Sequence, residues 1–222
     1  MNMKKKKDSS IFGIIGLGRF GTALAITLAE AGKEVIVVDQ NEEKVKAMRQ
    51  YTEYAFVCDN ISKEALSEVG IQNCDTVVVC IGSKIDTSIL TTLNVVSLGV
   101  PRVISKATSQ DQGAVLEKIG AEVVYPERQL ADWTAIRYTA DHILDYIELD
   151  EEHAIFEISV PNGWAGKTIG QLDIRKKYDI NIMALKHNGT MNLRISPDTS
   201  LPKDDTMLVL GDIKSIQKCF HI

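Results

Sequence analysis

Short apolar runs of strand length alternate with longer segments of helical spacing through residues 11–125. The runs are bounded by Gly, Asp, Asn or Pro, as buried strands are, whereas Ile89, Leu93 and Val96 show the spacing of a helix with one buried face. The expected strands cover residues 11–15, 35–38, 55–58, 77–81, 102–106 and 122–125. Strands that alternate with helices in this way predict an α/β domain built on a doubly wound parallel sheet.

A different pattern begins after Pro126. Residues 127–146 form one long helical pattern with an apolar stripe that includes Trp133. We interpret it as a crossover helix that packs on another subunit; packing on its own sheet is the alternative. From residue 148 onward the apolar residues follow the two-residue period of strands. Further strands at 180–186, 191–195 and 207–210 and helices at 168–178 and 213–219 complete a small α+β domain.

The turn after the first strand carries the spacing Gly-x-Gly-x-x-Gly, at Gly16, Gly18 and Gly21. Gly16 permits a tight turn, Gly18 lets a phosphate approach the backbone, and Gly21 lets the next helix pack close to the sheet. Asp39 ends the second strand, where an acid bonds a ribose hydroxyl and repels the 2′-phosphate of NADP. Strand, turn, helix, strand and acid form the Rossmann-like dinucleotide-binding fingerprint. The alternative is a domain that has kept the turn and lost the ligand.

Arg19 lies inside the glycine turn, at the expected phosphate site. Its guanidinium fork suits the terminal phosphate of ATP or ADP and is not required for NAD(H). A solvated arginine is the alternative.

Further candidates lie beyond the carboxyl ends of the strands, where doubly wound sheets bind ligands. Asp59 and Asn60 suit an adenine edge, and Ser83 lies at the end of the fourth strand. Helix capping and turn formation are the alternative for these three residues. Gly82 allows adenosine to approach closely, and Lys106 can reach a phosphate. The complete expected nucleotide site is Gly16, Gly18, Arg19, Phe20, Gly21, Asp39, Gln40, Asp59, Asn60, Ile81, Gly82 and Lys106.

The expected organisation therefore has four parts. A disordered tail covers residues 1–10, a nucleotide-binding domain covers 11–126, the crossover helix covers 127–146, and the C-terminal α+β domain covers 147–222.

Composition and charge exclude several classes of protein. The net charge of −5 gives no reason to expect a nucleic-acid partner. The four cysteines form no Cys-x-x-Cys pair, so we expect reduced core thiols rather than metal ligands. The basic start lacks the apolar core of a signal peptide, and no apolar segment has the length of a membrane span. Attachment to a membrane would therefore need a partner.

The sequence also lacks the motifs of an enzyme. None of the four histidines falls where a nicotinamide would lie, and Gly-x-Ser-x-Gly, His-Glu-x-x-His and a Walker lysine are absent. We expect nucleotide binding without chemistry. The rival, an NAD-dependent oxidoreductase, lacks a proton donor.

In combination these motifs resemble a known family. Gly16–Gly21, Val79–Gly82, Val115–Ala121 and Pro126-Glu127 are similar to the RCK (regulator of potassium conductance) N-terminal domain, or TrkA_N, of Ktr/Trk-type potassium uptake regulators. Leu172–Tyr178 is similar to the family's C-terminal domain, RCK_C or TrkA_C. The resemblance covers nearly the whole chain. It implies a cytoplasmic regulatory subunit, peripheral at the inner face of the cell membrane.

The resemblance also implies an assembly and its ligands. Homodimers formed through the crossover helix would assemble into an octameric ring on the potassium-translocating membrane subunit. ATP and ADP would switch the ring, with Arg19 at the terminal phosphate. Glu127 would approach a divalent or monovalent cation; a helix N-terminal acid after Pro126 is the alternative. Tyr125 stands where the resemblance leads us to expect His.

Some members of the family bind cyclic di-AMP at the dimer interface of the C-terminal domain. The positions that match this pattern are Ile169, Asp173, Ile174, Arg175, Asn181, Ile182 and Pro197. Arg175 would bond phosphate, and the isoleucines would pack on the bases. Core packing and a surface ion pair are the alternative for these residues. A stand-alone sensor of cyclic di-AMP or NAD(H) is the alternative function.

Overall fold

The structure is a computed structural model that describes residues 10–139 and 142–221. The chain divides into two compact units, Met1–Glu127 and Arg128–Ile222, which we describe separately. Apart from Ser10, the expected disordered tail lies outside the described residues.

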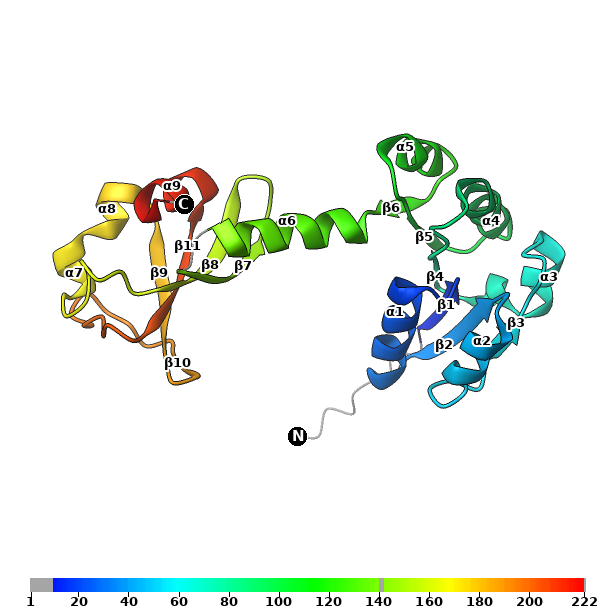
Figure 1. The fold of residues 1–222 in the computed structure, drawn as a ribbon, viewed down its shortest axis with the longest axis horizontal. Coiled ribbons are helices and arrows are strands. Elements are labelled where there is room, and N and C mark those ends of the chain that lie inside the picture. The colour runs from blue at the N-terminus through cyan, green and yellow to red at the C-terminus, as the bar shows by residue number, and fades with distance from the viewer. Residues whose placement is uncertain (1–9, 140–141, 222) are drawn as a thin grey trace, which may run out of the picture. The chain divides into compact units, whose positions relative to one another are not determined.

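In the described part of the first unit, six parallel strands form one sheet in the order β3-β2-β1-β4-β5-β6 (Figure 1). They are β1 (Ile11–Ile15), β2 (Glu34–Asp39), β3 (Ala55–Val57), β4 (Thr76–Val79), β5 (Arg102–Lys106) and β6 (Glu122–Val124). The helical segments between them are α1 (Arg19–Glu30), α2 (Glu42–Met48), α3 (Lys63–Glu68), the 3₁₀ turn η1 (Ile71–Asn73), α4 (Ile85–Ser97) and α5 (Gln110–Lys118). The expected Rossmann-like α/β fold is confirmed.

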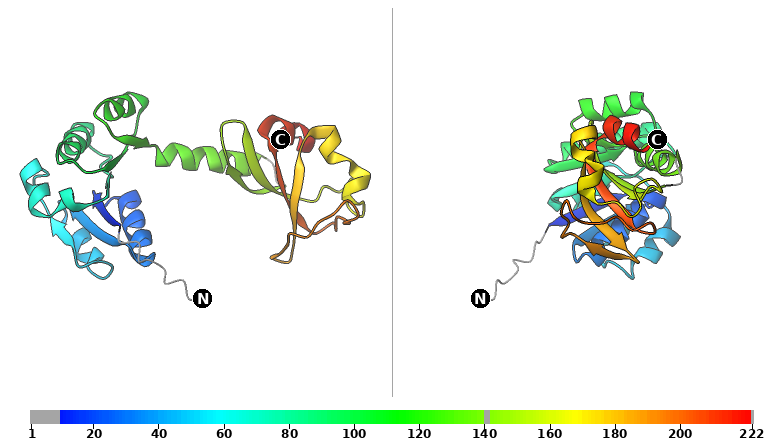
Figure 2. Two further views of the ribbon diagram at one scale, coloured as in Figure 1. Left: turned by 180° about the vertical axis from the view of Figure 1, so that it is seen from behind. Right: turned by 90° about the vertical axis from the view of Figure 1, so that its left-hand side faces the viewer.

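Both faces of this sheet are covered, because neighbouring residues of one strand enter different hydrophobic cores. Ile14 of β1 packs in a cluster with Ala25 of α1 and Met48 of α2. Ile15 packs in a second cluster with Leu66 of α3 and others from α4. The strand order reverses between β1 and β4, and a sheet of this kind binds ligands at that point. The same sheet is seen from behind in Figure 2.

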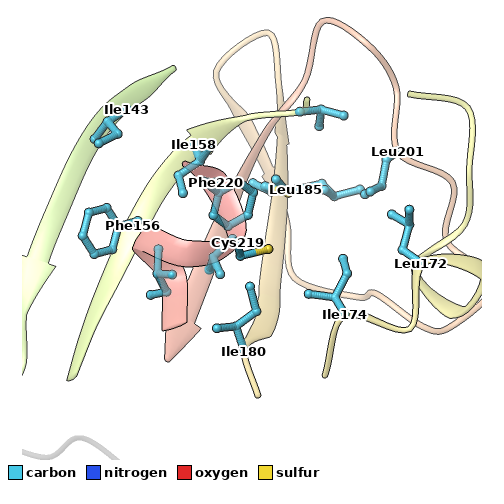
Figure 3. Packing of buried hydrophobic residues seen from close by; sticks show 14 of the residues in the cluster. Ile143, Phe156, Ile158, Leu172, Ile174, Ile180, Leu185, Leu201, Cys219 and Phe220 are labelled. Carbon is cyan, nitrogen blue, oxygen red and sulfur yellow. The ribbon is translucent and has the colours of Figure 1, made fainter. Parts of the chain in front are cut away.

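Within residues 142–221, five strands form an antiparallel sheet in the order β10-β9-β11-β8-β7. They are β7 (Ile143–Glu148), β8 (His153–Ser159), β9 (Asn181–His187), β10 (Thr190–Asn192) and β11 (Thr206–Asp212). The accompanying helices are α6 (Pro126–Thr139), which begins in the first unit, α7 (Ile169–Leu172), α8 (Ile174–Tyr178) and α9 (Ile213–Phe220). Phe156 and Ile158 of β8 and Phe220 of α9 lie in one buried core, which Figure 3 shows from close by. The expected small α+β domain is thereby confirmed.

The expected crossover helix at 127–146 is wrong in its last part. The helix is Pro126–Thr139, and Ile143–Glu148 forms the edge strand β7, in which Ile143 pairs with Ile158 and Tyr146 with Phe156. Ile143 is 3% exposed, and the Tyr146 ring stacks on Phe156 at 5.5 Å between centroids. Burial against β8 stabilises the strand. The C-terminal sheet therefore begins before residue 147.

Two other expected elements differ from the structure. The helix expected at 168–178 is two short helices, because Asp173 between them has φ = +50°, in the left-handed region. The return strand expected at 191–195 is the shorter Thr190–Asn192, and Leu193 beyond it is 71% exposed. Because the Leu193 side chain lies in solvent, its burial does not stabilise a longer strand.

Candidate functional site

A cavity of about 630 Å³ lies at the carboxyl ends of the strands in the first unit. It brings together eleven of the twelve residues expected to bind a nucleotide, and Glu127 as well. Gly21 is the exception, because it lies where α1 packs against the turn after β1 and does not line the cavity. The cavity is also lined by the candidate Ser83 and by residues that the sequence analysis did not include in the site: Lys44, Ile61, Cys80, Lys84 and Thr87. Cys80 directly follows β4, and Lys44 and Thr87 lie in the first turns of α2 and α4, the helices that follow β2 and β4. This position after a strand is the signal that could have found them.

The glycine turn has the geometry that its spacing predicts. Gly16 has φ = +97°, which side-chain-bearing residues rarely adopt. A Cβ atom on Gly21 would lie 2.0 Å from the carbonyl oxygen of Gly16, so only glycine allows α1 to start this close to β1. A Cβ atom on Gly18 would meet nothing within 4 Å. The backbone at Gly18 is therefore open to a ligand.

Asp39 holds the turn in place. Its Oδ2 accepts a hydrogen bond from the backbone N–H of Leu17, and its Oδ1 accepts one from Asn41 at 2.8 Å. The residue is 7% exposed, and the ammonium of Lys44 lies 4.0 Å from Oδ2. Each carboxylate oxygen has a second lone pair, so Asp39 can still accept a ribose hydroxyl.

Both basic and acidic side chains line the cavity. Arg19, Lys44, Lys84 and Lys106 line it together with the acids Asp39, Asp59 and Glu127. The 12-residue α1 begins at Arg19, and its N-cap is Gly18, which has no side chain to bond the first N–H groups. Free N–H groups, the helix dipole and the nearby cations together suit a phosphate-bearing ligand.

Lys106 and Glu127 form an ion pair in the same cavity. The Lys106 side chain is only 12% exposed, whereas that of Glu127 is 68% exposed. The hydrogen bond from Lys106 lowers the pKa of the Glu127 carboxyl. Among the described residues, no group of three or more His, Cys, Asp or Glu side chains is placed to hold a metal ion. The cation expected at Glu127 would take its other ligands from a bound nucleotide or from a second subunit.

The cysteines are free thiols. Burial raises the pKa of Cys80, which lines the cavity, to about 12, and that of Cys74 also to about 12. Burial likewise raises the pKa of Cys219 to about 11. These groups are protonated at neutral pH, as inert core thiols are.

A second cavity, of about 370 Å³, lies in the C-terminal unit. The residues that line it include all seven expected effector positions, which come from α7, α8, the start of β9 and the 195–197 segment: Ile169, Asp173, Ile174, Arg175, Asn181, Ile182 and Pro197. Gly170 fixes one wall, since its N–H donates to the carbonyl oxygen of Pro197 at 2.7 Å. The cavity combines partly buried isoleucines with Arg175.

The chain matches two family models in tandem. Residues 12–126 match the TrkA-N domain, and residues 154–221 match the TrkA-C domain. The chain belongs to the TrkA-N/TrkA-C family. The two matches fall on the two sheets described above, so each family domain corresponds to one of the two cavities.

Relatives in this family match over almost the full chain. The Ktr system potassium uptake protein C of Bacillus subtilis (strain 168) is 38% identical over 208 residues, which are 93% of this chain and 94% of that protein. The Ktr system potassium uptake protein A of the same organism is 36% identical over the same shares of both chains.

A solved structure shares the fold. The GsuK channel bound to NAD matches 95% of this chain with a TM-score of 0.64 and 20% identity, and the match spans 38% of that chain. At this identity the likeness concerns the fold alone. In the part of our chain that the structure describes, every helix is too short or too polar to cross a membrane.

Proposed function

We propose that this TrkA-N/TrkA-C protein is the nucleotide-gated regulatory subunit of a membrane potassium channel or transporter. The observation that carries the proposal is a single cavity that combines an open glycine turn, Arg19, Asp39 and Lys106. The family and the full-length likeness to two proteins named for potassium uptake supply the biological setting.

ATP and ADP are the proposed ligands of this cavity. The phosphates would lie at Gly18 and the start of α1, and the ribose would bond Asp39. Asp59 and Asn60 would take the adenine edge, and Arg19 would contact the terminal phosphate. A ligand shifts a protein between two shapes only by its difference in affinity for them. The γ-phosphate of ATP supplies such a difference, because ADP lacks it.

The proposed assembly is a homodimer that builds a homo-octameric ring at the inner face of the membrane. Exposed apolar residues on α6 support the dimer, since Leu130 is 63% exposed and Tyr138 is 77% exposed. Exposed apolar side chains mark a contact surface where they gather into one patch. A cation shared with Glu127 belongs to the same proposal.

Cyclic di-AMP is the proposed ligand of the C-terminal cavity. The support is that all seven positions of the family pattern lie around one hollow. Arg175 would bond a phosphate there, and Ile174 and Ile182 would pack on the bases.

A potassium-flux assay tests the proposed function. The purified protein is added to vesicles that carry the membrane subunit of a Ktr system, with ATP or with ADP. We expect flux to differ between the two nucleotides and the difference to vanish without this protein. Equal flux in ATP and ADP would refute nucleotide gating.

An NAD(H) sensor is the second candidate, because the glycine turn followed by Asp39 is a dinucleotide fingerprint. Binding of NADH but not of ATP or ADP would favour it. Turnover of a nicotinamide substrate would instead favour the oxidoreductase.

A further inference from the structure

Lys106 has an anion at its ammonium group, the carboxylate of Glu127. Its side chain extends from the last residue of β5 and is 12% exposed. The carboxylate of Glu127, in the first turn of α6, pairs with the Lys106 Nζ atom. The Lys106 side chain is therefore almost buried in the cavity, whereas that of Glu127 is mostly in solvent.

The position of Lys106 matters because it covers one of the cavity's glycines. A Cβ atom built on Gly82 would lie 3.3 Å from the Nζ of Lys106 and 3.6 Å from its Cε. The ammonium group therefore lies beside Gly82, where the sequence analysis expects the nucleotide to approach the backbone. An anionic ligand group that reaches Lys106 meets the Glu127 carboxylate at the same atom.

We propose that Glu127 is a built-in competitor of the nucleotide. In the ligand-free protein it occupies Lys106, and a phosphate of the ligand takes its place. This inference rests on the proposed function, because it requires an anionic nucleotide in this cavity. Two anions beside one ammonium repel each other, so binding a phosphate favours release of Glu127.

The release has a structural consequence. Glu127 sits where β6 passes into α6, and α6 continues into the second unit. The Lys106–Glu127 pair ties the first turn of α6 to the end of β5. When Lys106 pairs with a phosphate of the ligand instead, this ion pair between β5 and α6 is lost. The freed carboxylate can then join the bound phosphates in holding a cation.

The two roles of Glu127 predict effects of opposite sign. Without a divalent cation, Glu127→Gln removes a competitor and tightens nucleotide binding. With magnesium present, the same substitution removes a cation ligand and loses this advantage. Because Glu127 is largely exposed, solvent screens the competition, and we expect a gain of about two- to fivefold in affinity.

The test is calorimetric titration of ADP into the full chain in EDTA, followed by titration with magnesium. The variants are Glu127→Gln, Lys106→Gln and the double variant. Glu122→Gln is the matched control, because Glu122 also pairs with a cation at β5, Arg102, but does not line the cavity. Thermal unfolding of each variant shows that it is folded.

We expect Glu127→Gln to bind ADP more tightly in EDTA and Lys106→Gln to bind it more weakly. In the Lys106→Gln background, Glu127→Gln should have no effect, and Glu122→Gln should match the wild type. Unchanged or weaker ADP binding by Glu127→Gln in EDTA would overturn the competitor role and leave the proposed function standing. Failure of the wild type to bind both ADP and ATP would overturn both.

Discussion

Two glycines of the same turn should respond in opposite ways to one added methyl group. The Cβ of Gly21→Ala would lie 2.0 Å from the carbonyl oxygen of Gly16 and 3.0 Å from the Cβ of Cys80. Since Cβ contacts under 3.0 Å are essentially never seen, α1 must move away from the turn by about 1 Å. Overpacking of this kind typically costs about 1–3 kcal/mol.

Gly18→Ala adds the same methyl group three residues earlier. Gly18 has φ = −74° and ψ = −175°, a conformation that alanine adopts without strain, and the new Cβ would meet no atom within 4 Å. Its free energy of unfolding should stay within about 1 kcal/mol of the wild-type value, because the reduced freedom of the unfolded chain favours alanine whereas the N-cap position favours glycine. The methyl group would, however, stand where a phosphate approaches the backbone.

Urea denaturation and calorimetric titration of ADP on both variants test this contrast. We expect Gly21→Ala to lose stability, and Gly18→Ala to keep its stability while binding ADP more weakly. Wild-type stability in Gly21→Ala would show that the turn is not as tight as described. Wild-type affinity in Gly18→Ala would show that the ligand does not approach the turn.

Three further predictions concern the C-terminal unit and the thiols. Arg175→Ala should abolish binding of cyclic di-AMP and leave ADP binding unchanged in the same calorimeter; a parallel loss of both would contradict separate sites. Ile143→Ala should lower the free energy of unfolding by about 2–5 kcal/mol in urea, as a buried strand residue does, whereas no loss would argue against β7. At pH 8, Cys74, Cys80 and Cys219 should react with a thiol reagent only after unfolding, since burial raises the pKa of each to between about 11 and about 12; rapid reaction of Cys80 in the folded protein would contradict its burial.

The N-terminal fold was predictable because its signals are local. Each buried strand is a short apolar run, and the glycine spacing directly encodes a turn that needs φ > 0 at Gly16 and no side chain at Gly21. The carboxyl ends of parallel strands meet at one edge, so residues distant in sequence could be assigned to one cavity.

The strand β7 was not predictable in the same way. Ile143, Leu144, Tyr146 and Ile147 are spaced so that a helix and a strand both fit. Pairing with β8 and burial of Ile143 decide between them, and these contacts depend on the tertiary structure. The break between α7 and α8 at Asp173 was not predictable either. An aspartate inside a helical pattern does not indicate in the sequence that its backbone is left-handed.

The Lys106–Glu127 pair also depends on tertiary structure. The two residues lie 21 positions apart, and they meet because β5 ends beside the start of α6. Sequence analysis could assign each residue to the same rim. It could not show that the two side chains form an ion pair.

The most direct test of nucleotide gating asks whether Arg19 contributes more to the affinity for ATP than to the affinity for ADP. Calorimetric titration of both nucleotides is compared for the wild type, Arg19→Ala and Arg49→Ala, a control arginine at the end of α2 that does not line the cavity. A charge-assisted bond to the γ-phosphate should make Arg19→Ala lose about tenfold in ATP affinity, with a smaller loss for ADP. Equal losses for both nucleotides, or no binding of either to the wild type, would contradict the account.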